Sequence, residues 1–343
     1  MAKVVTLGEI MMRLSSKGNN RLLSAKELDV CYGGGEANVA VSLAHYNHEA
    51  YFVSRLPKND LGESAIRELR KENVHVDYIA RGGDRIGIYY LETGSSIRPS
   101  KVTYDRKNSA IAEASLENID LENALKGADV FHFSGITPAL SKSCAEIVEK
   151  ACQIAKRNGT LVSCDLNYRK KLWSKEEARK AMIPLMKYVD ICIGNEEDAE
   201  ACLGYKPDSD VSKGKTDAEG YKGIFTKMQK DFGFKIIAST LRESFSASHN
   251  GWKALLYDGN KFYESRRYDI CPIVDRVGSG DAFSAGLIHG LLSYKGDLQK
   301  ALEFGVAASA LKHTIPGDFN QVSEEEVLNL MNGDASGRVS RWN

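Results

Sequence analysis

Hydrophobic positions along the 343-residue chain alternate between two patterns. Short runs rich in β-branched residues are separated by longer stretches whose apolar residues recur at helical spacing. This alternation predicts an α/β fold of the doubly wound type, in which helices cover both faces of a mostly parallel sheet. The expected strands are Lys3–Leu7, Ala50–Arg55, Val130–Ser134, Thr160–Asp165, Val189–Ile193 and Lys235–Thr240, and the expected helices are Glu36–Asn47, Asp60–Glu72, Ser141–Asn158 and Ser174–Tyr188.

Two segments break this rhythm. Residues 13–32 are polar and extended in character, and residues 86–107 hold two alternating stretches, Ile86–Glu92 and Lys101–Arg106, joined by a turn-rich connection. Two strands without a helix between them do not belong in a parallel sheet. We therefore expect a single α/β domain over residues 1–343 with a small antiparallel β lid inserted in it, built from both segments. An irregular surface insertion is the alternative.

Composition and charge argue against several classes of protein. Hydrophobic residues make up 43% of the chain and charged residues 27%, which is typical of a globular protein. The 46 basic and 46 acidic side chains give no net charge, so nothing favours nucleic acid or a membrane surface as a partner. Residues 1–10 resemble a strand and not a secretion signal. The seven scattered cysteines lack any Cys-x-x-Cys pair, which is typical of reduced thiols and predicts a cytoplasmic protein.

Two possible nucleotide motifs are incomplete. Gly214-Lys215-Thr216 resembles the end of a P-loop, but Ser209 stands where the first glycine should be, and the preceding residues are too polar for a buried strand. We interpret this segment as a surface turn. The first expected strand is followed by a single glycine, Gly8, and not by Gly-x-Gly-x-x-Gly, so a nicotinamide-dependent oxidoreductase is not supported.

The segment Asp275–Leu292 (DRVGSGDAFSAGLIHGLL) carries more information. Gly278-Ser279-Gly280 precedes a helix that we expect to begin at Asp281 and to pack closely through two glycines on its apolar face. Backbone amides and the positive end of the helix dipole would meet at this turn, where they suit the charge of a transferring phosphoryl group. Asp281 could serve there as a general base or as an ordinary helix N-cap, and residue preferences at helix ends alone leave both interpretations open.

A second glycine-rich stretch, Gly33-Gly34-Gly35, precedes the expected helix Glu36–Asn47 and would let the backbone approach a ligand closely. Together the two stretches resemble the signatures of the ribokinase-like, or PfkB, family of carbohydrate kinases, with the catalytic aspartate at Asp281. The order and separation of the motifs match, and the resemblance covers essentially the whole chain. It implies ATP and Mg²⁺, or another divalent cation, as cofactors, and a monovalent cation could also take part.

Within this family the chain is most similar to 2-keto-3-deoxygluconate kinases, through Gly8-Glu9-Ile10, Tyr104-Asp105-Arg106 and Asp165–Arg169. The resemblance implies ATP-dependent phosphorylation of a sugar acid at its terminal hydroxyl, with Asp281 as the general base. The implied residues are Asp281, Gly278, Ser279 and Gly280 for catalysis; Gly33, Gly34, Tyr89, Tyr104, Arg106, Arg169 and Asp318 for the sugar acid; Asn167, Arg169, Asn195, Thr240, Arg242, Gly278, Gly280 and Ser309 for ATP; and Asn195 and Asp198 for the metal.

The chemistry of arginine agrees with a sugar acid, because its planar fork binds a carboxylate through two parallel hydrogen bonds. Taken singly, Arg106 and Arg169 could also be solvated side chains or members of structural ion pairs, and Tyr89 and Tyr104 could be apolar filling. The alternatives to a sugar-acid kinase are a fructokinase or another neutral-sugar kinase, and a non-catalytic sugar or nucleotide sensor on the same fold.

The chain departs from the family pattern at three places. Asp198 stands where a longer glutamate is usual, and the expected nucleotide loop Leu241–Ser244 lacks a glycine. Met11-Met12-Arg13 replaces the aspartate with which ribokinases hold sugar hydroxyls, which argues against ribose. The exposed edges of the lid strands further predict a homo-oligomer that forms through the lid.

Overall fold

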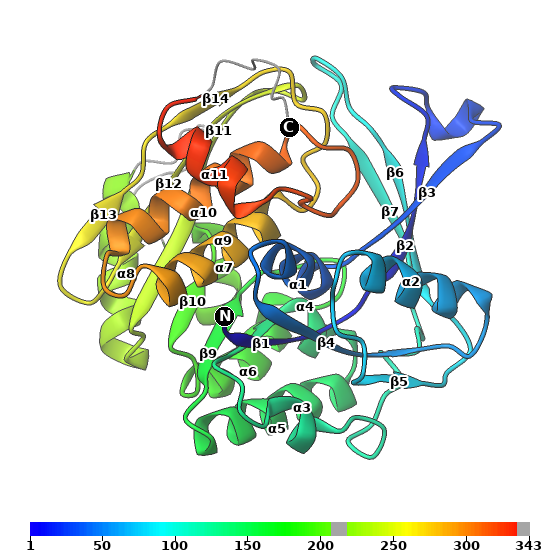
Figure 1. The fold of residues 1–343 in the computed structure, drawn as a ribbon, viewed down its shortest axis with the longest axis horizontal. Helices are drawn as coiled ribbons and strands as arrows, with labels where there is room; N and C mark the ends of the chain where they lie inside the picture. Colours follow the sequence, from blue (N-terminus) through cyan, green and yellow to red (C-terminus); the bar gives the residue numbers. More distant parts are fainter. Residues whose placement is uncertain (207–217, 335–343) are drawn as a thin grey trace, which may run out of the picture.

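The main sheet is parallel in its centre and antiparallel at one edge (Figure 1). The computed structural model describes residues 1–206 and 218–334, and within them the strand order is β13-β12-β11-β10-β9-β8-β1-β4-β5, with β14 also pairing with β12. Strands β5 to β11 along this order are parallel to their neighbours, and β12, β13 and β14 pair antiparallel. The strands are β1 (Lys3–Leu7), β4 (Glu49–Leu56), β5 (Ile79–Arg81), β8 (Val130–Ser134), β9 (Leu161–Asp165), β10 (Ile191–Ile193), β11 (Ile236–Ser246), β12 (His249–Tyr257), β13 (Phe262–Glu264) and β14 (Tyr268–Ile270).

All the strands expected from the sequence are present, but one expected loop is wrong. Leu241–Ser244 is not a loop after a strand, because β11 continues to Ser246. The chain reverses there into β12, so the backbone groups of this stretch find ladder partners, with Arg242 opposite Trp252. The loop was expected from the family resemblance, and Arg242 and Ser244 of this stretch are exposed on the hairpin. The possible P-loop at Gly214-Lys215-Thr216 lies outside the described residues.

Helices cover both faces of the main sheet (Figure 1). The helices form two groups. The hydrophobic residues of the first group pack against one face of the sheet, on strands β1, β4, β8 and β10–β12, and those of the second group pack against the opposite face. The first group comprises α1 (Gly35–His45), α2 (Asp60–Lys71), α9 (Ser279–Ser293), α10 (Leu298–Lys312) and α11 (Glu324–Met331). The second comprises α3 (Leu121–Leu125), α4 (Ile136–Leu140), α5 (Lys142–Arg157), α6 (Lys175–Met186), α7 (Glu196–Leu203) and α8 (Ala218–Phe232).

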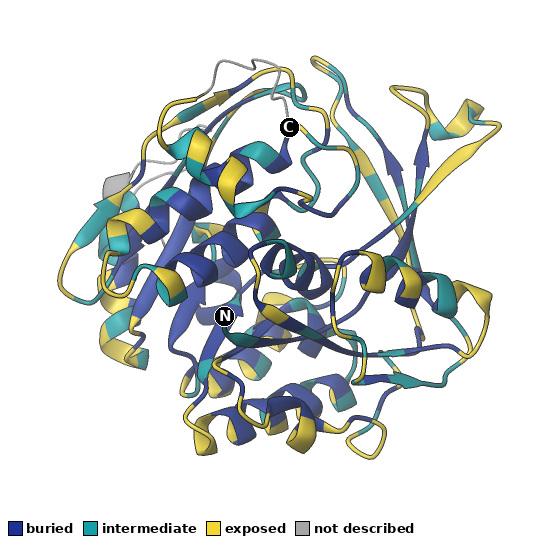
Figure 2. Ribbon diagram, viewed as in Figure 1, coloured by how far each residue is buried: buried dark blue, intermediate teal, exposed yellow. Residues whose placement is uncertain are grey.

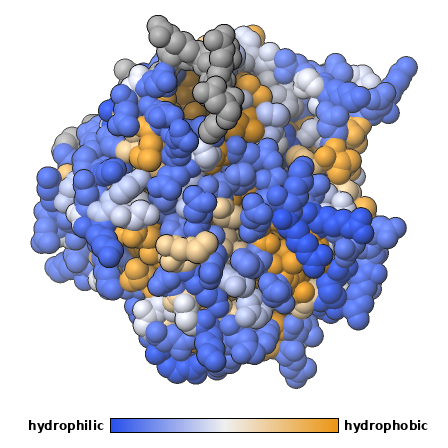
Figure 3. Space-filling model, viewed as in Figure 1, coloured by the Kyte–Doolittle hydropathy of each residue, from blue (hydrophilic) through white to orange (hydrophobic). Residues whose placement is uncertain are grey.

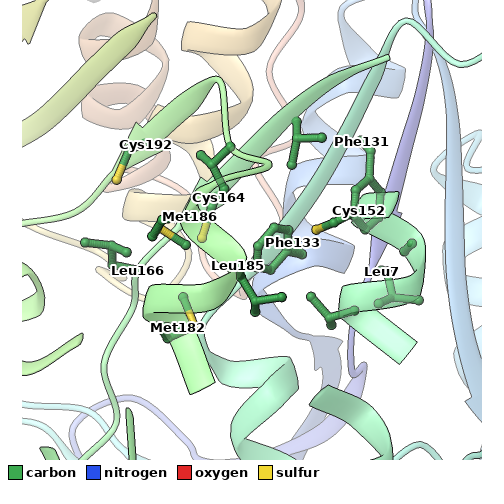
Figure 4. Packing of buried hydrophobic residues seen from close by; sticks show 14 of the residues in the cluster. Leu7, Phe131, Phe133, Cys152, Cys164, Leu166, Met182, Leu185, Met186 and Cys192 are labelled. Atoms are coloured by element: carbon green, nitrogen blue, oxygen red, sulfur yellow. The ribbon is translucent and has the colours of Figure 1, made fainter. Parts of the chain in front are cut away.

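The hydrophobic core under α5 and α6 is closely packed (Figures 2 and 4). Phe133 from β8, Cys164 from β9 and Met182 from α6 are completely buried there. Full burial of a side chain as large as phenylalanine or methionine stabilises the fold by about 1.5–3 kcal/mol. All seven cysteines are free thiols, as the sequence predicted.

Helix α9 packs against α10 almost backbone to backbone. A Cβ atom added at Gly286 would lie 2.8 Å from Cα of Gly305, and one added at Gly290 would lie 2.5 Å from Cα of Ala301. The predicted close packing through two small residues is therefore confirmed. The helix begins at Ser279 and not at Asp281, because Gly278 adopts a positive φ of 83° and ends the preceding turn two residues earlier than expected.

The lid is a separate four-stranded sheet in the order β3-β2-β6-β7, which projects beside the main body (Figure 1). Its strands are β2 (Met11–Ser16), β3 (Leu28–Gly33), β6 (Gly87–Glu92) and β7 (Lys101–Asp105), and η1 (Leu22–Ser24) lies between β2 and β3. Strands β2 and β3 and strands β6 and β7 pair antiparallel, and β2 runs parallel to β6. Both expected lid segments thus form one sheet, joined through a pairing that links distant parts of the chain.

The surface seen in Figure 3 is largely hydrophilic, with hydrophobic residues in scattered groups. Among the described residues, none of the helices combines the length and the apolar character needed to cross a bilayer.

Candidate active site

A cavity of about 500 Å³ lies where the ends of the central strands, the first turn of α9 and the lid come together. Parallel strands end at one edge of a sheet, so side chains from β9, β10 and β11 converge there. Of the site residues expected from the sequence, the lining includes Gly34, Tyr89, Tyr104, Arg106, Asn167, Arg169, Asn195, Asp198, Thr240, Arg242, Gly278, Ser279, Gly280, Asp281 and Asp318. Gly33 and Ser309 are not part of it.

The Gly278–Asp281 turn presents backbone amides to this cavity. A side chain at Gly278 would collide with the carbonyl oxygen of Asp318, and its positive φ is one that only glycine adopts without strain. In the part of the chain that the structure describes, no side chain caps α9. The Ser279 amide donates to the carbonyl of Arg276 at 3.3 Å, so the amides of Gly280 and Asp281, together with the helix dipole, are the ones available to an anion.

Asp281 is the third residue of α9, so it is not the helix N-cap that the sequence also allowed. Its Oδ2 accepts a hydrogen bond of 2.6 Å from Nδ2 of Asn38 in α1. Burial raises the pKa of Asp281 to about 7, against the lowering effect of Asn38, and the carboxylates of Asp318 and Glu36 raise it further. A carboxyl group with this pKa is about half ionised at neutral pH, and its ionised form is basic enough to accept a proton.

Asn38 is held in place by the glycine-rich stretch before α1. Its Oδ1 accepts a hydrogen bond from the amide of Gly34 at 3.2 Å. A side chain at Gly34 would collide with the carbonyl of Glu9, and a Cβ at Gly35 would come within 3.7 Å of Oδ1 of Asp281. The glycines therefore bring the start of α1 close to the first turn of α9, which places Asn38 against the carboxylate.

An acidic group lies at the ends of β9 and β10. Asn195 and Asp198 form the reciprocal N-cap of α7: Oδ1 of Asn195 accepts from the Asp198 amide at 2.9 Å, and Oδ2 of Asp198 accepts from the Asn195 amide at 3.2 Å. Burial, together with the neighbouring Asp198 and Asp281, raises the pKa of Asp165 well above its usual range. The positive charge of Arg169 acts in the opposite direction and lowers the pKa values of Asp165, Asp198 and Asp281.

These residues fit a divalent cation that is bound largely through water. No cluster of three or more histidine, cysteine or acidic side chains suited to a metal occurs in residues 1–206 and 218–334. A cation would nevertheless favour the ionised forms of Asp165 and Asp198, whose pKa values are raised by burial, and Mg²⁺ in phosphate sites keeps several waters and uses only one or two carboxylates. Asp165 and Asp198 are thus the groups that would hold it.

The other end of the cavity is basic. Arg242 from β11 and Arg276, which precedes the Gly278 turn, both line it. Burial lowers the pKa of Arg276, and the positive charge of Arg242 lowers it further. Two guanidinium groups that disfavour each other beside free helix amides are a suitable place for the phosphates of a nucleotide.

On the lid side, Asp318 is the centre of a buried network. Its Oδ1 accepts hydrogen bonds from Nη1 of Arg13 at 2.8 Å and from the Tyr89 hydroxyl at 2.6 Å. Arg13 also pairs with Asp275, with 2.6 Å between Nη2 and Oδ2. The network thereby connects β2 and β6 of the lid to the loop before α9, which holds Asp275, and to the loop after α10, which holds Asp318. Gly33 is a glycine because a side chain there would collide with the Asp318 carboxylate.

Arg106 lines the cavity but is already paired. Its Nε donates to Oε2 of Glu9 at 2.8 Å, and Nη2 contacts the same oxygen. Both side chains are buried, and Oε1 of Glu9 also accepts from Ser109. The ion pair leaves Nη1 as the terminal nitrogen that Arg106 can offer to a substrate. Arg169, in contrast, is exposed at the cavity wall.

Comparison with known proteins assigns this arrangement to a family. The model of the pfkB family of carbohydrate kinases matches residues 1–324. The chain belongs to this family.

A 2-dehydro-3-deoxygalactonokinase of Haloferax volcanii is 33% identical over 98% of each chain. The crystal structure of a Thermotoga maritima 2-dehydro-3-deoxygluconokinase is 51% identical, with a TM-score of 0.93 over 97% of this chain and 100% of that one. A pfkB carbohydrate kinase of Listeria grayi is 37% identical, with a TM-score of 0.89 over 96% and 99%. The resemblance stated from the motifs is thus confirmed.

In this pfkB kinase, one residue that was expected to bind ATP lies behind the cavity wall. Ser309 is completely buried, and its hydroxyl donates to the carbonyl of Ser279 at 2.7 Å, so it supports the turn from below.

Sequence reasoning missed Asn38 as the partner of Asp281, and Arg13 as the partner of Asp318. Asn38 belongs to the N-terminal signature, which was the available signal. Nothing local marked Arg13, since its partners lie 262 and 305 residues further along the chain.

Proposed function

We propose that this kinase transfers the γ-phosphoryl group of ATP to the terminal hydroxyl of a 2-keto-3-deoxy sugar acid, namely 2-keto-3-deoxygluconate, to give the 6-phosphate. The observation that carries the proposal is a single cavity in which Asp281 and the first turn of α9 face Tyr89, Tyr104 and the arginines Arg106 and Arg169. The names of the Thermotoga and Haloferax relatives support the same substrate class.

The chemistry assigned to these residues is a direct phosphoryl transfer. The Asp281 carboxylate accepts the proton of the sugar hydroxyl as that oxygen bonds to the γ-phosphorus and the bond to the β-phosphate oxygen breaks, releasing ADP. The amides of Gly278–Asp281 stabilise the charge that spreads over the transferring group. Asn38 holds Asp281 in the orientation that the attack requires.

ATP would lie along the edge of the sheet from Asn195 to the basic end at Arg242, with Asn167 and Thr240 beside it. A Mg²⁺ ion held by Asp165 and Asp198 through water would neutralise part of the triphosphate charge. Asn195 is then a cap that orients Asp198 more than a direct ligand.

The sugar carboxylate is assigned to the arginine side of the cavity. Arg169 is exposed there and can turn its fork to a ligand, whereas Arg106 is fixed by Glu9 and offers one nitrogen. A neutral sugar would leave these donors without a partner once the lid closes, which disfavours it. The carboxylate thus distinguishes acids from neutral sugars such as fructose.

One coupled assay tests the proposal. Initial rates with ATP and Mg²⁺ are measured side by side for 2-keto-3-deoxygluconate, 2-keto-3-deoxygalactonate, fructose and ribose. We expect kcat/KM to be highest for the sugar acids. A preference for fructose would refute the sugar-acid assignment and leave the family, and no transfer to any sugar would support a sensor.

The remaining parts of the proposal concern the whole chain. We infer that residues 1–343 form one α/β domain whose lid, over residues 13–32 and 86–107, closes on the sugar. A second copy is expected to cover the outer face of the lid, where Leu14, Tyr90 and the exposed Val30 lie in one row across β6, β2 and β3. The free thiols agree with a cytoplasmic location.

A further inference from the structure

Lys312 is a completely buried lysine that the phosphoryl-transfer chemistry does not use. It is the last residue of α10, and its whole side chain is inaccessible to solvent. Its ammonium group donates to two backbone carbonyl oxygens, that of Ile315 at 3.0 Å and that of Asp275 at 3.5 Å. Lysines are almost never fully buried without a specific partner, so this placement requires an explanation.

The two carbonyls belong to the two loops that support the phosphate-binding turn. Asp275 begins the loop that leads into Gly278, and Ile315 lies in the loop after α10 that leads to Asp318. The loops are also joined directly, since the amides of Val274 and Asp275 donate to the carbonyl of His313. The ammonium group of Lys312 therefore crosslinks the loops at a second point.

Lys312 also lies directly under the turn itself. A Cβ atom added at Gly278 would be 3.4 Å from Cε of Lys312. The carbonyl of Asp275, three residues before Gly278, points to the buried ammonium group, which satisfies it. A cation at this point satisfies the carbonyls and places a positive charge on the protein side of the turn.

The charges around Lys312 fit this role. The carboxylates of Asp275 and Asp318 flank it, Asp281 interacts with it, and Arg13 is the neighbouring cation. Burial lowers the pKa of Lys312, and these three carboxylates act in the opposite direction. Arg13 is shared between Asp275 and Asp318, so Lys312 supplies the second positive charge of a group with three acidic members.

We propose that Lys312 is a positioning residue for phosphoryl transfer: a covalently attached cation that holds the Gly278–Asp281 turn in its anion-binding conformation. The inference rests on the proposed function for its kinetic consequences. It carries a specific corollary, because an ammonium group bound by carbonyl oxygens occupies the kind of place that a free K⁺ or NH₄⁺ ion could fill. The wild-type kinase is therefore independent of added monovalent cations.

The test uses four proteins assayed in KCl, NH₄Cl, NaCl and choline chloride at equal ionic strength. Lys312→Met removes the charge but keeps the length of the side chain, and Lys312→Ala removes both. Lys300→Met, an exposed position on the same helix, is the matched control. Melting temperatures in each salt are measured alongside kcat and the KM values.

Wild type and Lys300→Met should show the same kcat in all four salts. Lys312→Met should lose kcat by about tenfold or more, the scale of a displaced reacting group, while KM for the sugar changes little. In Lys312→Ala, NH₄Cl or KCl should restore much of the lost kcat and raise the melting temperature, and choline chloride should do neither. Packing alone cannot produce rescue by a small cation.

Several results would overturn the inference. These are a wild-type rate that rises severalfold in KCl over choline chloride, a normal kcat in Lys312→Met, or a stably folded Lys312→Ala protein without any cation response. If both variants fail to fold, the salt dependence of the wild type decides alone. If the wild type transfers phosphate to no sugar, the proposed function fails, and the melting temperatures of Lys312→Ala in the four salts still test the cation site.

Discussion

At the scale of single residues, the proposed site depends on a raised pKa of Asp281 and on a hydrogen bond that holds its side chain in place. One buried region holds three carboxyl groups, those of Asp281, Glu36 and Asp318. A hydrogen bond from Asn38 stabilises the charged form of Asp281. The balance places the pKa of Asp281 at about 7 and makes the base sensitive to each neighbour.

Asp281→Asn should separate catalysis from stability. Loss of the general base should lower kcat by at least about a hundredfold, with nucleotide affinity retained. A carboxyl whose pKa is raised by folding destabilises the folded state once the pH exceeds its unfolded value, and fully above about pH 7. The amide carries no charge, so the variant should melt at a higher temperature than wild type at pH 8. Near-normal turnover would end the assignment of the base.

Asn38→Ala should move the pH profile. In the wild type, kcat/KM should rise with pH through about 7 as Asp281 loses its proton. Without the Asn38 donor the carboxylate is less stabilised, so this acidic limb should shift to higher pH. Steady-state rates from pH 5.5 to 9 measure the shift. A lower kcat with an unmoved limb would mean that Asn38 only supports the Gly34 turn.

At the scale of elements, the lid is joined to the body both by hydrophobic contacts and by buried ion pairs. Met11, Tyr89 and Leu91 form a small hydrophobic cluster of their own, while Met12 and Tyr32 belong to the main-body cluster. Arg13 and Arg106 connect the lid region to Asp318 and Glu9 of the body. Buried pairs of this kind fix geometry, and removing one partner leaves an uncompensated charge.

Arg106→Ala should therefore have two effects. It should raise KM for 2-keto-3-deoxygluconate, and it should lower the melting temperature because Glu9 is left buried and unpaired, at about 3–5 kcal/mol for such a break. Arg106→Lys should recover only part of both effects, since a point charge cannot replace the fork.

Arg169→Ala is the matched comparison, because Arg169 is exposed and its loss should weaken substrate binding without loss of stability. Activity with fructose separates the roles of Arg106. If Arg106→Ala weakens fructose and the sugar acid equally, Arg106 holds the lid and does not recognise the carboxylate.

The lid also shows how far sequence patterns reach. Alternation along residues 86–107 predicted β6 and β7, and the paired glycines of α9 predicted its close packing, because both signals are local. The parallel pairing of β2 with β6 and the links from Arg13 to Asp275 and Asp318 join residues far apart in sequence. Periodicity carries no information about such pairs. The start of α9 was misplaced because the φ of Gly278, not the identity of Asp281, decides where the helix begins.

At the scale of the whole molecule, the outer face of the lid is only partly covered among the described residues: Leu14 packs against the main-body hydrophobic cluster, whereas Val30 is exposed. The row of Leu14, Tyr90 and Val30 is apolar, and Val30 is 57% exposed on a strand at the edge of the sheet. Apolar rows on an edge sheet favour association with another chain.

Val30→Lys should weaken an oligomer formed through this face. Light scattering after size exclusion should show a multiple of the monomer mass for the wild type and a smaller species for the variant. Leu23→Lys, an exposed position on η1 outside the row, is the control and should leave the mass unchanged. A fully active wild-type monomer would remove the subunit contact and leave the role of the lid in closure intact.

The interlocked glycines of α9 and α10 have a consequence for how such a kinase can change over time. Because Gly286, Gly290 and Gly305 let the two backbones touch, the helix that carries Asp281 tolerates almost no variation along its inner face. The lid strands, by contrast, would meet the sugar through side chains on a thin sheet if the proposed function holds. Sugar preference could then diverge by substitutions in the lid while the transfer machinery is inherited unchanged, and an exchange of lids between relatives should change specificity.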